Sequence, residues 1–163
     1  TESRVEVRIP PDLPIELVLV GEQGGAQIDL GGLWLTAADL EFHMGGAEID
    51  FSAPLHRPLE RLDLRSSMGG REVTGLGNAS PRVLDVSSSM GGVAMDLAGA
   101  WAGDCRARFR VRMGGMAIGS TPGLVVRPWS EQAQELQPED AEVPVPTLWY
   151  EADVSMGEID ISR

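Results

Sequence analysis

Polar and apolar side chains alternate along short runs of the chain, and each run ends in Met-Gly-Gly or a close variant. The methionines of the four complete copies are Met44, Met68, Met90 and Met113, and a shortened copy begins at Met156. The copies recur about every 22 to 24 residues, a period typical of repeat proteins in which each unit is covered by its neighbours. Alternation with a period of two predicts β-strands with one buried and one solvent-facing side.

A second strand is predicted after each pair of glycines. In the complete copies its inward residue lies five positions after the methionine, at Ile49, Val73, Met95 and Ile118. The last copy reads as tightened, with Ile159 three positions after Met156. Because both offsets are odd, the glycines must break the pleat, which their freedom at positive φ allows. Two strands and two corners per ~22 residues predict an all-β fold, a β-solenoid whose turns stack by parallel pairing about 4.8 Å apart.

The methionines before the glycines are expected to line the core. Each ends the inward-facing set of its strand, and methionine fills irregular gaps well. A soft-metal site built from thioethers is the alternative, but core packing explains the pattern without a ligand. On the outward side, Glu41 should meet Arg65 and Asp85 should meet Arg108 on the adjacent turn, which favours a single register.

We interpret residues 1–163 as one solenoid domain. Its parts are 1–20, a pair of N-terminal capping strands; 21–123, the regular Gly-Gly repeats; 124–147, an acidic, proline-rich insertion; and 148–163, the last turn. The insertion reads as a surface excursion, in which Ser130 to Leu136 could form a short helix before the prolines end it.

Composition narrows the function classes. With 163 residues, 42% hydrophobic content and 20 glycines, the chain can form a packed domain of short strands and tight corners. A formal net charge of −12 opposes nucleic acid as a partner. Its single cysteine, Cys105, excludes an intramolecular disulfide. No apolar stretch reaches the ~20 residues that a membrane-spanning helix needs, so membrane attachment would require a segment absent from this sequence.

Short motifs in the chain resemble a known family. The alternating run, the glycine corner, the Ile-Asp-Leu type of second strand and the lead-in Val5-Glu-Val-Arg-Ile-Pro10 are similar to the toast-rack domains. These include putative-adhesin head domains and the C-terminal domain of LiaF-like cell-wall-active antibiotics response proteins. The resemblance implies a single-stranded, right-handed β-helix on a bacterial envelope, with no catalytic residues to carry over.

Candidate sites are few. Asp29, Asp50, Asp96 and Asp160 recur at one outward position, which could suit calcium or glycoside hydrolysis, but a solvated face explains them as well. His43, His56 and Cys105 lack partner residues at the spacing that a catalytic triad or a zinc site requires. We therefore predict no catalytic, cofactor-binding or metal residues. Exposed indoles could bind sugar or protein, so the candidate partner-binding residues are Trp101, Trp129 and Trp149.

The function expected is that of a non-enzymatic structural or interaction module of the bacterial cell envelope, in stress response or adhesion. Its partner is expected to be a protein or a cell-wall glycan, and its location extracytoplasmic or membrane-associated. One alternative is a protein that acts on or binds polysaccharide through surface carboxylates. Another is a self-assembling scaffold built by end-to-end stacking, although a monomer is expected rather than a filament.

Overall fold

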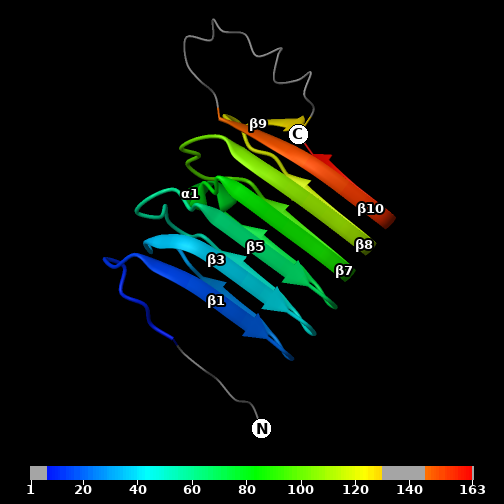
Figure 1. The fold of residues 1–163 in the computed structure, drawn as a ribbon, viewed down its shortest axis with the longest axis horizontal. Helices are drawn as coiled ribbons and strands as arrows, with labels where there is room; N and C mark the ends of the chain where they lie inside the picture. Colours follow the sequence, from blue (N-terminus) through cyan, green and yellow to red (C-terminus); the bar gives the residue numbers. More distant parts are fainter. Residues whose placement is uncertain (1–6, 130–145, 163) are drawn as a thin grey trace, which may run out of the picture.

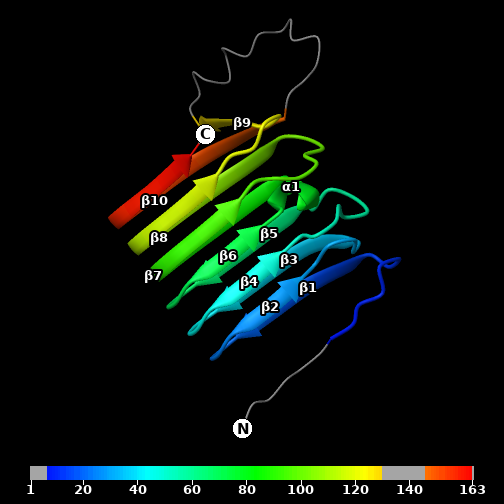
Figure 2. The same ribbon diagram turned by 180° about the vertical axis from the view of Figure 1, so that it is seen from behind.

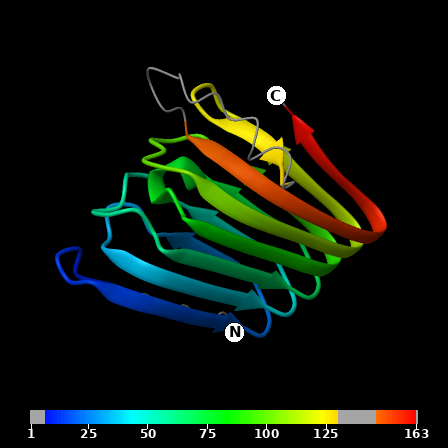
Figure 3. The ribbon, with the colours of Figure 1, turned by 45° about the horizontal axis from the view of Figure 1, so that its top comes forward.

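The chain forms a single-stranded, right-handed β-solenoid of about five turns of ~23 residues (Figure 1), which confirms the predicted fold. A computed structural model describes residues 7–129 and 146–162. All strand pairs in it are parallel, and each turn lies directly on the turn before it (Figures 1 and 3). The alternating sequence produces this arrangement because the apolar side of every strand must be covered by the strand on the opposite side of the same turn.

Each turn contributes one strand to each of two sheets. The first sheet, seen from the front in Figure 1, contains β1 (Ile15–Gly21), β3 (Leu35–Phe42), β5 (Arg61–Ser66) and the first halves of β7 (Val83–Asp96), β8 (Cys105–Gly119) and β10 (Thr147–Ser162). The second sheet, seen from behind in Figure 2, contains β2 (Ala26–Asp29), β4 (Ala47–Asp50), β6 (Arg71–Thr74) and the second halves of β7, β8 and β10. A short helix, α1 (Leu76–Ala79), lies between β6 and β7, in the corner that leads from the second sheet to the first sheet of the next turn. β9 (Val125–Pro128) pairs with β10.

The core lies between the two sheets as stacked columns of apolar side chains. One column runs through Leu40, Leu64, Val86 and Phe109, each opposite the next and each almost completely buried. The facing column runs through Ile49, Val73, Met95 and Ile118. This second column confirms the prediction that an inward residue lies five positions after each methionine.

The last turn is not tightened as the sequence suggested. Ile161, five positions after Met156, lies opposite Ile118, so the spacing of five continues. Glu158 lies opposite Gly115 and takes the place of a second glycine. That position needs no glycine, because a side chain there meets nothing closer than ordinary van der Waals contact.

The first glycine of each corner is required by geometry. Gly45, Gly69, Gly91 and Gly114 have φ of +100°, +106°, +115° and +121°, a region that L side chains avoid. A Cβ at any of them would also overlap the carbonyl oxygen of the corner glycine one turn below. The corners therefore stack backbone on backbone, with no space for a side chain.

The two ends of the solenoid differ from the predicted boundaries. β1, within the expected capping strands, is instead the first turn of the solenoid and pairs with β3, whereas Val7 and Ile9 lie outside any strand. At the other end, Leu124 is buried and β9 pairs with the start of β10, so part of the predicted excursion belongs to the sheet. The helix predicted for Ser130 to Leu136 lies outside the described residues.

One inward position holds an arginine. Arg71 lies between Ala47 and Val93 in a core column and is buried. Its guanidinium donates hydrogen bonds to backbone oxygens of the corner, including those of Phe42 and Met68, both at 3.1 Å. Burial lowers the pKa of Arg71. These bonds give the buried guanidinium hydrogen-bond acceptors inside the fold, in addition to the backbone N–H that the Phe42 carbonyl already accepts from Ser67.

The outward columns lie in the predicted register, but Arg65 and Glu41 form their ion pairs with other residues. Arg65 lies opposite Glu41, as expected. Its guanidinium instead approaches the carboxylates of Asp39 and Asp63, at 3.7 and 3.6 Å, while Glu41 pairs with His43 at 3.2 Å. Such exposed pairs help to fix the register more than they stabilise the fold.

Replacing the first corner glycine should destabilise the solenoid. Gly91→Ala combines a positive φ with an overlap against the backbone of the turn below, so we expect a loss of at least about 2 kcal/mol in the free energy of unfolding. Gly92→Ala is the matched control, since a Cβ at Gly92 has a free approach and should change stability by less than about 0.5 kcal/mol. Urea unfolding followed by circular dichroism measures both. Equal losses in the two variants would contradict the backbone-stacking explanation.

Candidate functional site

The three predicted tryptophans do not form one exposed patch. Trp149 is only 6% exposed, so its predicted role as a contact residue is wrong. Trp129 packs edge-on against Trp149, with ring centroids 6.2 Å apart, and carries the Arg106 guanidinium 4.4 Å above its ring. Trp101 lies apart from them at a corner, where its indole N–H donates to the Leu97 carbonyl at 2.7 Å. Trp101 and Trp129 are half-buried and engaged within the chain.

The methionines before the glycines point outward, which overturns the prediction that they line the core. Their exposed fractions run from 42% to 65%, at Met44, Met68, Met90, Met113 and Met156. The inward side chains that flank each corner are those two positions before the methionine and three after it, as at Phe42 and Ala47. The methionine is thus the first residue of the corner and turns away from the core. The odd offset across the corner was visible in the sequence, but it does not tell on which side of the glycine the pleat breaks.

Oxidation should distinguish the two classes of methionine. Hydrogen peroxide reaches exposed thioethers, so the five corner methionines should form sulfoxides in the folded protein. Met95 and Met116, only 4% and 2% exposed, serve as internal controls and should oxidise at least tenfold more slowly. Peptide mapping by mass spectrometry gives the rate at each position. Equal oxidation rates at Met90 and Met95 would contradict the exposed position of the corner methionines.

Two of the recurring aspartates, Asp29 and Asp50, accept hydrogen bonds from neighbouring residues of the solenoid. Asp29 lies opposite Asp50, and its carboxylate accepts hydrogen bonds from the Gly31 N–H at 2.9 Å and from the Ser52 hydroxyl at 2.8 Å. These bonds, the Gly31 one foremost, lower the pKa of Asp29. Asp50 similarly accepts from the Thr74 hydroxyl at 2.9 Å. Both carboxylates are thereby committed to local structure.

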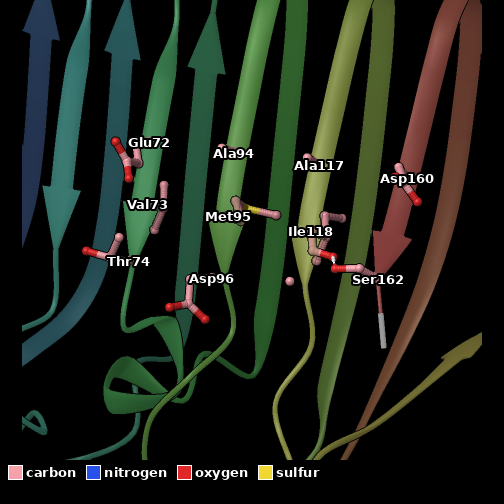
Figure 4. Close-up of a pocket in the computed structure, with 11 residues that line it drawn as sticks. Glu72, Val73, Thr74, Ala94, Met95, Asp96, Ala117, Ile118, Asp160 and Ser162 are labelled. Carbon is pink, nitrogen blue, oxygen red and sulfur yellow. Dashed lines mark hydrogen bonds between the residues drawn. The ribbon is translucent and has the colours of Figure 1, made fainter.

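Asp160 does not belong to that column. It lies opposite Ala117, two positions away from Gly119, the residue opposite which the column would have placed it. Together with Glu72 it borders a hollow of about 200 Å³ on the second sheet, whose centre is open because Ala94 and Ala117 are small (Figure 4). In Figure 4 the two carboxylates stand on opposite sides of this hollow. Within residues 7–129 and 146–162, no three His, Cys, Asp or Glu side chains are grouped as a metal site requires.

The cysteine and histidines carry no catalytic arrangement. Cys105 is 1% exposed, and burial, with a smaller contribution from Asp104, raises the pKa of its thiol to about 12. The thiolate needed for nucleophilic chemistry is therefore scarce at neutral pH. His43 faces Glu41, and His56 packs near the Trp34 ring, with centroids 6.1 Å apart.

A row of arginines on the first sheet is the feature that the candidate-site predictions missed. Every outward position of β8 from Arg106 to Arg112 is an arginine, whereas the residues between them face the core. We call Arg106, Arg108, Arg110 and Arg112 the arginine row. Its signal is present in the sequence as the alternation Cys-Arg-Ala-Arg-Phe-Arg-Val-Arg, of which only Arg108 entered the predictions, as a register partner of Asp85.

A hollow of about 560 Å³ lies beside the arginine row. It forms because Ser87 and Ser89 on β7 are short, while Arg65, Arg110 and Arg112 stand around them. Arg65, Ser87 and Arg110 are consecutive members of one outward column. The hollow, called here the first-sheet hollow, thus combines guanidinium groups with hydroxyls that can donate or accept hydrogen bonds.

The arginine row is partly neutralised within the chain. Arg106 and Arg108 each approach Glu151 at 3.8 Å. Asp85, which lies opposite Arg108 as predicted, pairs instead with Arg110 at 3.2 Å. Arg112, the last member of the row, makes no ion pair with any residue that the structure describes. The uncompensated positive charge is therefore at the Arg112 end, next to the serines of the first-sheet hollow.

An acidic column reaches the same hollow through one of its members, Asp63. Asp39, Asp63 and Asp85 lie opposite one another on successive turns. The pKa of Asp63 is raised, first because the carboxyl is partly buried and then because Asp85 and Asp39 repel its charge, although Arg65 opposes the shift. Ionised Asp63 thus costs folding free energy, because the folded chain holds its proton more tightly than the unfolded chain does.

Neutralising Asp63 should stabilise the protein at neutral pH. As the pH rises from the unfolded value of about 3.9 through the raised folded pKa, the wild-type chain loses stability that Asp63→Asn does not lose. Thermal unfolding should show a higher midpoint for the variant at pH 7, and the gap should close near pH 3. Asp39→Asn, on the same column and beside the same arginine, is the control and should give a smaller gain, because it removes part of the repulsion on Asp63 but leaves the burial of the Asp63 charge unchanged. A lower midpoint for Asp63→Asn at pH 7 would contradict the assigned direction.

The comparisons with known proteins add no family. No protein-family model matches the chain, and no curated protein and no solved structure matches it either. Among the described residues, no helix is long and apolar enough to cross a membrane.

Proposed function

We propose that the chain is a non-enzymatic binding module of the bacterial cell envelope that holds an acidic polysaccharide along the arginine row. The observation that carries this proposal is the run of four outward arginines beside the first-sheet hollow, in a chain with a formal net charge of −12. All 13 basic residues of the chain are arginines. Four of them lie on one face of one strand and form a local concentration of positive charge, although the chain as a whole is acidic.

The chemistry of the row suits carboxylate or phosphate groups on an extended chain. A guanidinium binds such groups through two parallel hydrogen bonds, which a lysine ammonium cannot do. From Arg106 to Arg112 the strand rises about 20 Å, a length suited to a polymer rather than a small molecule. Ser87 and Ser89 add hydroxyls that can bind sugar hydroxyl groups.

The overall negative charge does not prevent this contact. At physiological ionic strength charges are screened beyond about 8 Å, so distant carboxylates act weakly on a ligand seated on the row. They do lower the rate of long-range encounter with polyanions, which disfavours nucleic acid. The envelope location rests on the resemblance of the glycine-centred motifs to toast-rack domains, including the putative-adhesin and LiaF-like groups.

Binding of polygalacturonate, a carboxylated polysaccharide, tests the proposal. In titration calorimetry the wild-type chain should bind it, and the double variant Arg110→Ser/Arg112→Ser should bind at least about tenfold more weakly, because two charge-assisted contacts are lost. The control Arg57→Ser/Arg127→Ser removes the same charge elsewhere and should retain most of the affinity. Neutral dextran and a DNA oligonucleotide should bind weakly or not at all. Equal losses of affinity in both double variants would mean that only the net charge matters, which would contradict a binding site on β8.

A second candidate function follows from Asp63. A carboxyl with a raised pKa beside a sugar-sized hollow is the group that general-acid cleavage of a glycosidic bond requires, and Asp153 borders the same hollow. Incubation with the polysaccharide followed by size-exclusion chromatography separates the two functions. An unchanged chain length supports a binding module, whereas shortening that is abolished in Asp63→Asn supports an enzyme.

A further inference from the structure

The first turn of the solenoid exposes apolar side chains where later turns carry polar ones. Val18 and Val20 on β1 point outward and are 65% and 52% exposed. Their register partners on β3 are Asp39 and Glu41. The same two columns continue with charged or polar residues on every later turn, as Asp63 and Arg65, Asp85 and Ser87, Arg108 and Arg110, and Glu151 and Asp153.

The edge and inner side of this turn are apolar as well. β1 ends the first sheet and β2 ends the second, so each has a strand partner on one side only within the described residues. The inward side chains Leu17 and Leu19 are half-buried, whereas their equivalents on later turns are covered from both sides. Ile9 from the lead-in packs against part of this end. A strand that is apolar on both faces with an unpaired edge is typical of a strand that another chain covers.

Head-to-tail stacking of the chain is blocked at the other end. β9 pairs with β10 over Thr147–Tyr150 and occupies the edge that β1 of a second copy would need. A continuous filament is therefore disfavoured, because β9 would have to leave this edge first.

We propose that two copies of the chain join through their β1 strands, paired antiparallel about a twofold axis at Val18. In this register Val18 faces Val18 of the second copy, Leu17 faces Leu19, and Val20 faces the aliphatic stem of Glu16. The pairing provides partners for the free N–H and C=O groups of both edges and covers apolar side chains on both faces of the sheet. Because the contact is isologous, it closes at two chains.

The twofold axis has a consequence for the outer faces. The local twofold of an antiparallel pair is perpendicular to the sheet, so the first sheets of the two copies face the same side. The two arginine rows then lie on one continuous surface. The dimer itself does not depend on the proposed function, but a polymer that binds one row could reach the other and bind with higher avidity.

Light scattering coupled to size-exclusion chromatography tests the dimer on the full chain. The wild type should elute with twice the 17.5 kDa mass of the chain at about 100 µM. Val18→Glu places two carboxylates opposite each other at the axis and should raise the dissociation constant at least tenfold, while its outward position leaves the fold intact. Val83→Glu, on an exposed valine of β7, is the control and should remain dimeric. A wild-type monomer at this concentration, or a mass that keeps growing with concentration, would overturn the proposal.

Cysteine cross-linking checks the register separately. Val18→Cys should form an interchain disulfide under mild oxidation, because directly opposed Cβ atoms in an antiparallel pair lie about 4.5–5.5 Å apart. Val20→Cys should cross-link much less, since it faces Glu16. The native Cys105 is buried and does not compete. Efficient cross-linking at position 20 but not at 18 would disprove the axis at Val18. If Val154→Glu at the C-terminal end dissolves the dimer and Val18→Glu does not, the contact is head-to-tail.

Discussion

The fold depends on a close backbone contact that recurs at every Met-Gly corner. The first glycine of each corner lies against the carbonyl of the corner glycine below, with no room for a Cβ. This contact fixes the height of each turn and the register of the two strands that leave the corner. In-register stacking then aligns inward side chains into columns and outward side chains into others. The apolar core and the outward columns of charged residues are both products of that single alignment.

Much of this arrangement could be predicted from the sequence because it is periodic. The glycine spacing, the two strands per turn and the five-residue offset to Ile49 and its equivalents identify the solenoid. The side on which the methionines lie could not be predicted in the same way. A period-two pattern continues through Met44 as if the strand did, whereas in the structure β3 ends at Phe42 and the Met44 side chain is exposed.

The ends of the repeat were harder to predict than its middle. Asp160 was assigned to the wrong column because Glu158 replaces a glycine at a position where glycine is not required. Trp149 looked exposed because it follows a proline-rich segment, yet β9 returns to cover that region of the sheet. In both cases the determining contact comes from one neighbouring turn, and the periodicity of the other turns contains no information about it.

The arginine row shows how a solenoid strand separates residues that pack the core from residues that face solvent. On β8, Ala107, Phe109 and Val111 fill the core, so their identities are constrained by packing with the turns above and below. The arginines between them are free of that constraint, because an outward side chain contributes little to the core. Their partners on neighbouring strands are carboxylates in contact at only part of the row. If the arginines served only to fix the register of the strands, one arginine opposite each acidic residue would be enough. That role does not explain Arg112, which has no ion-pair partner among the described residues. The proposed ligand, which would bridge the serines and the end of the row, would give that residue a role as well as the other three.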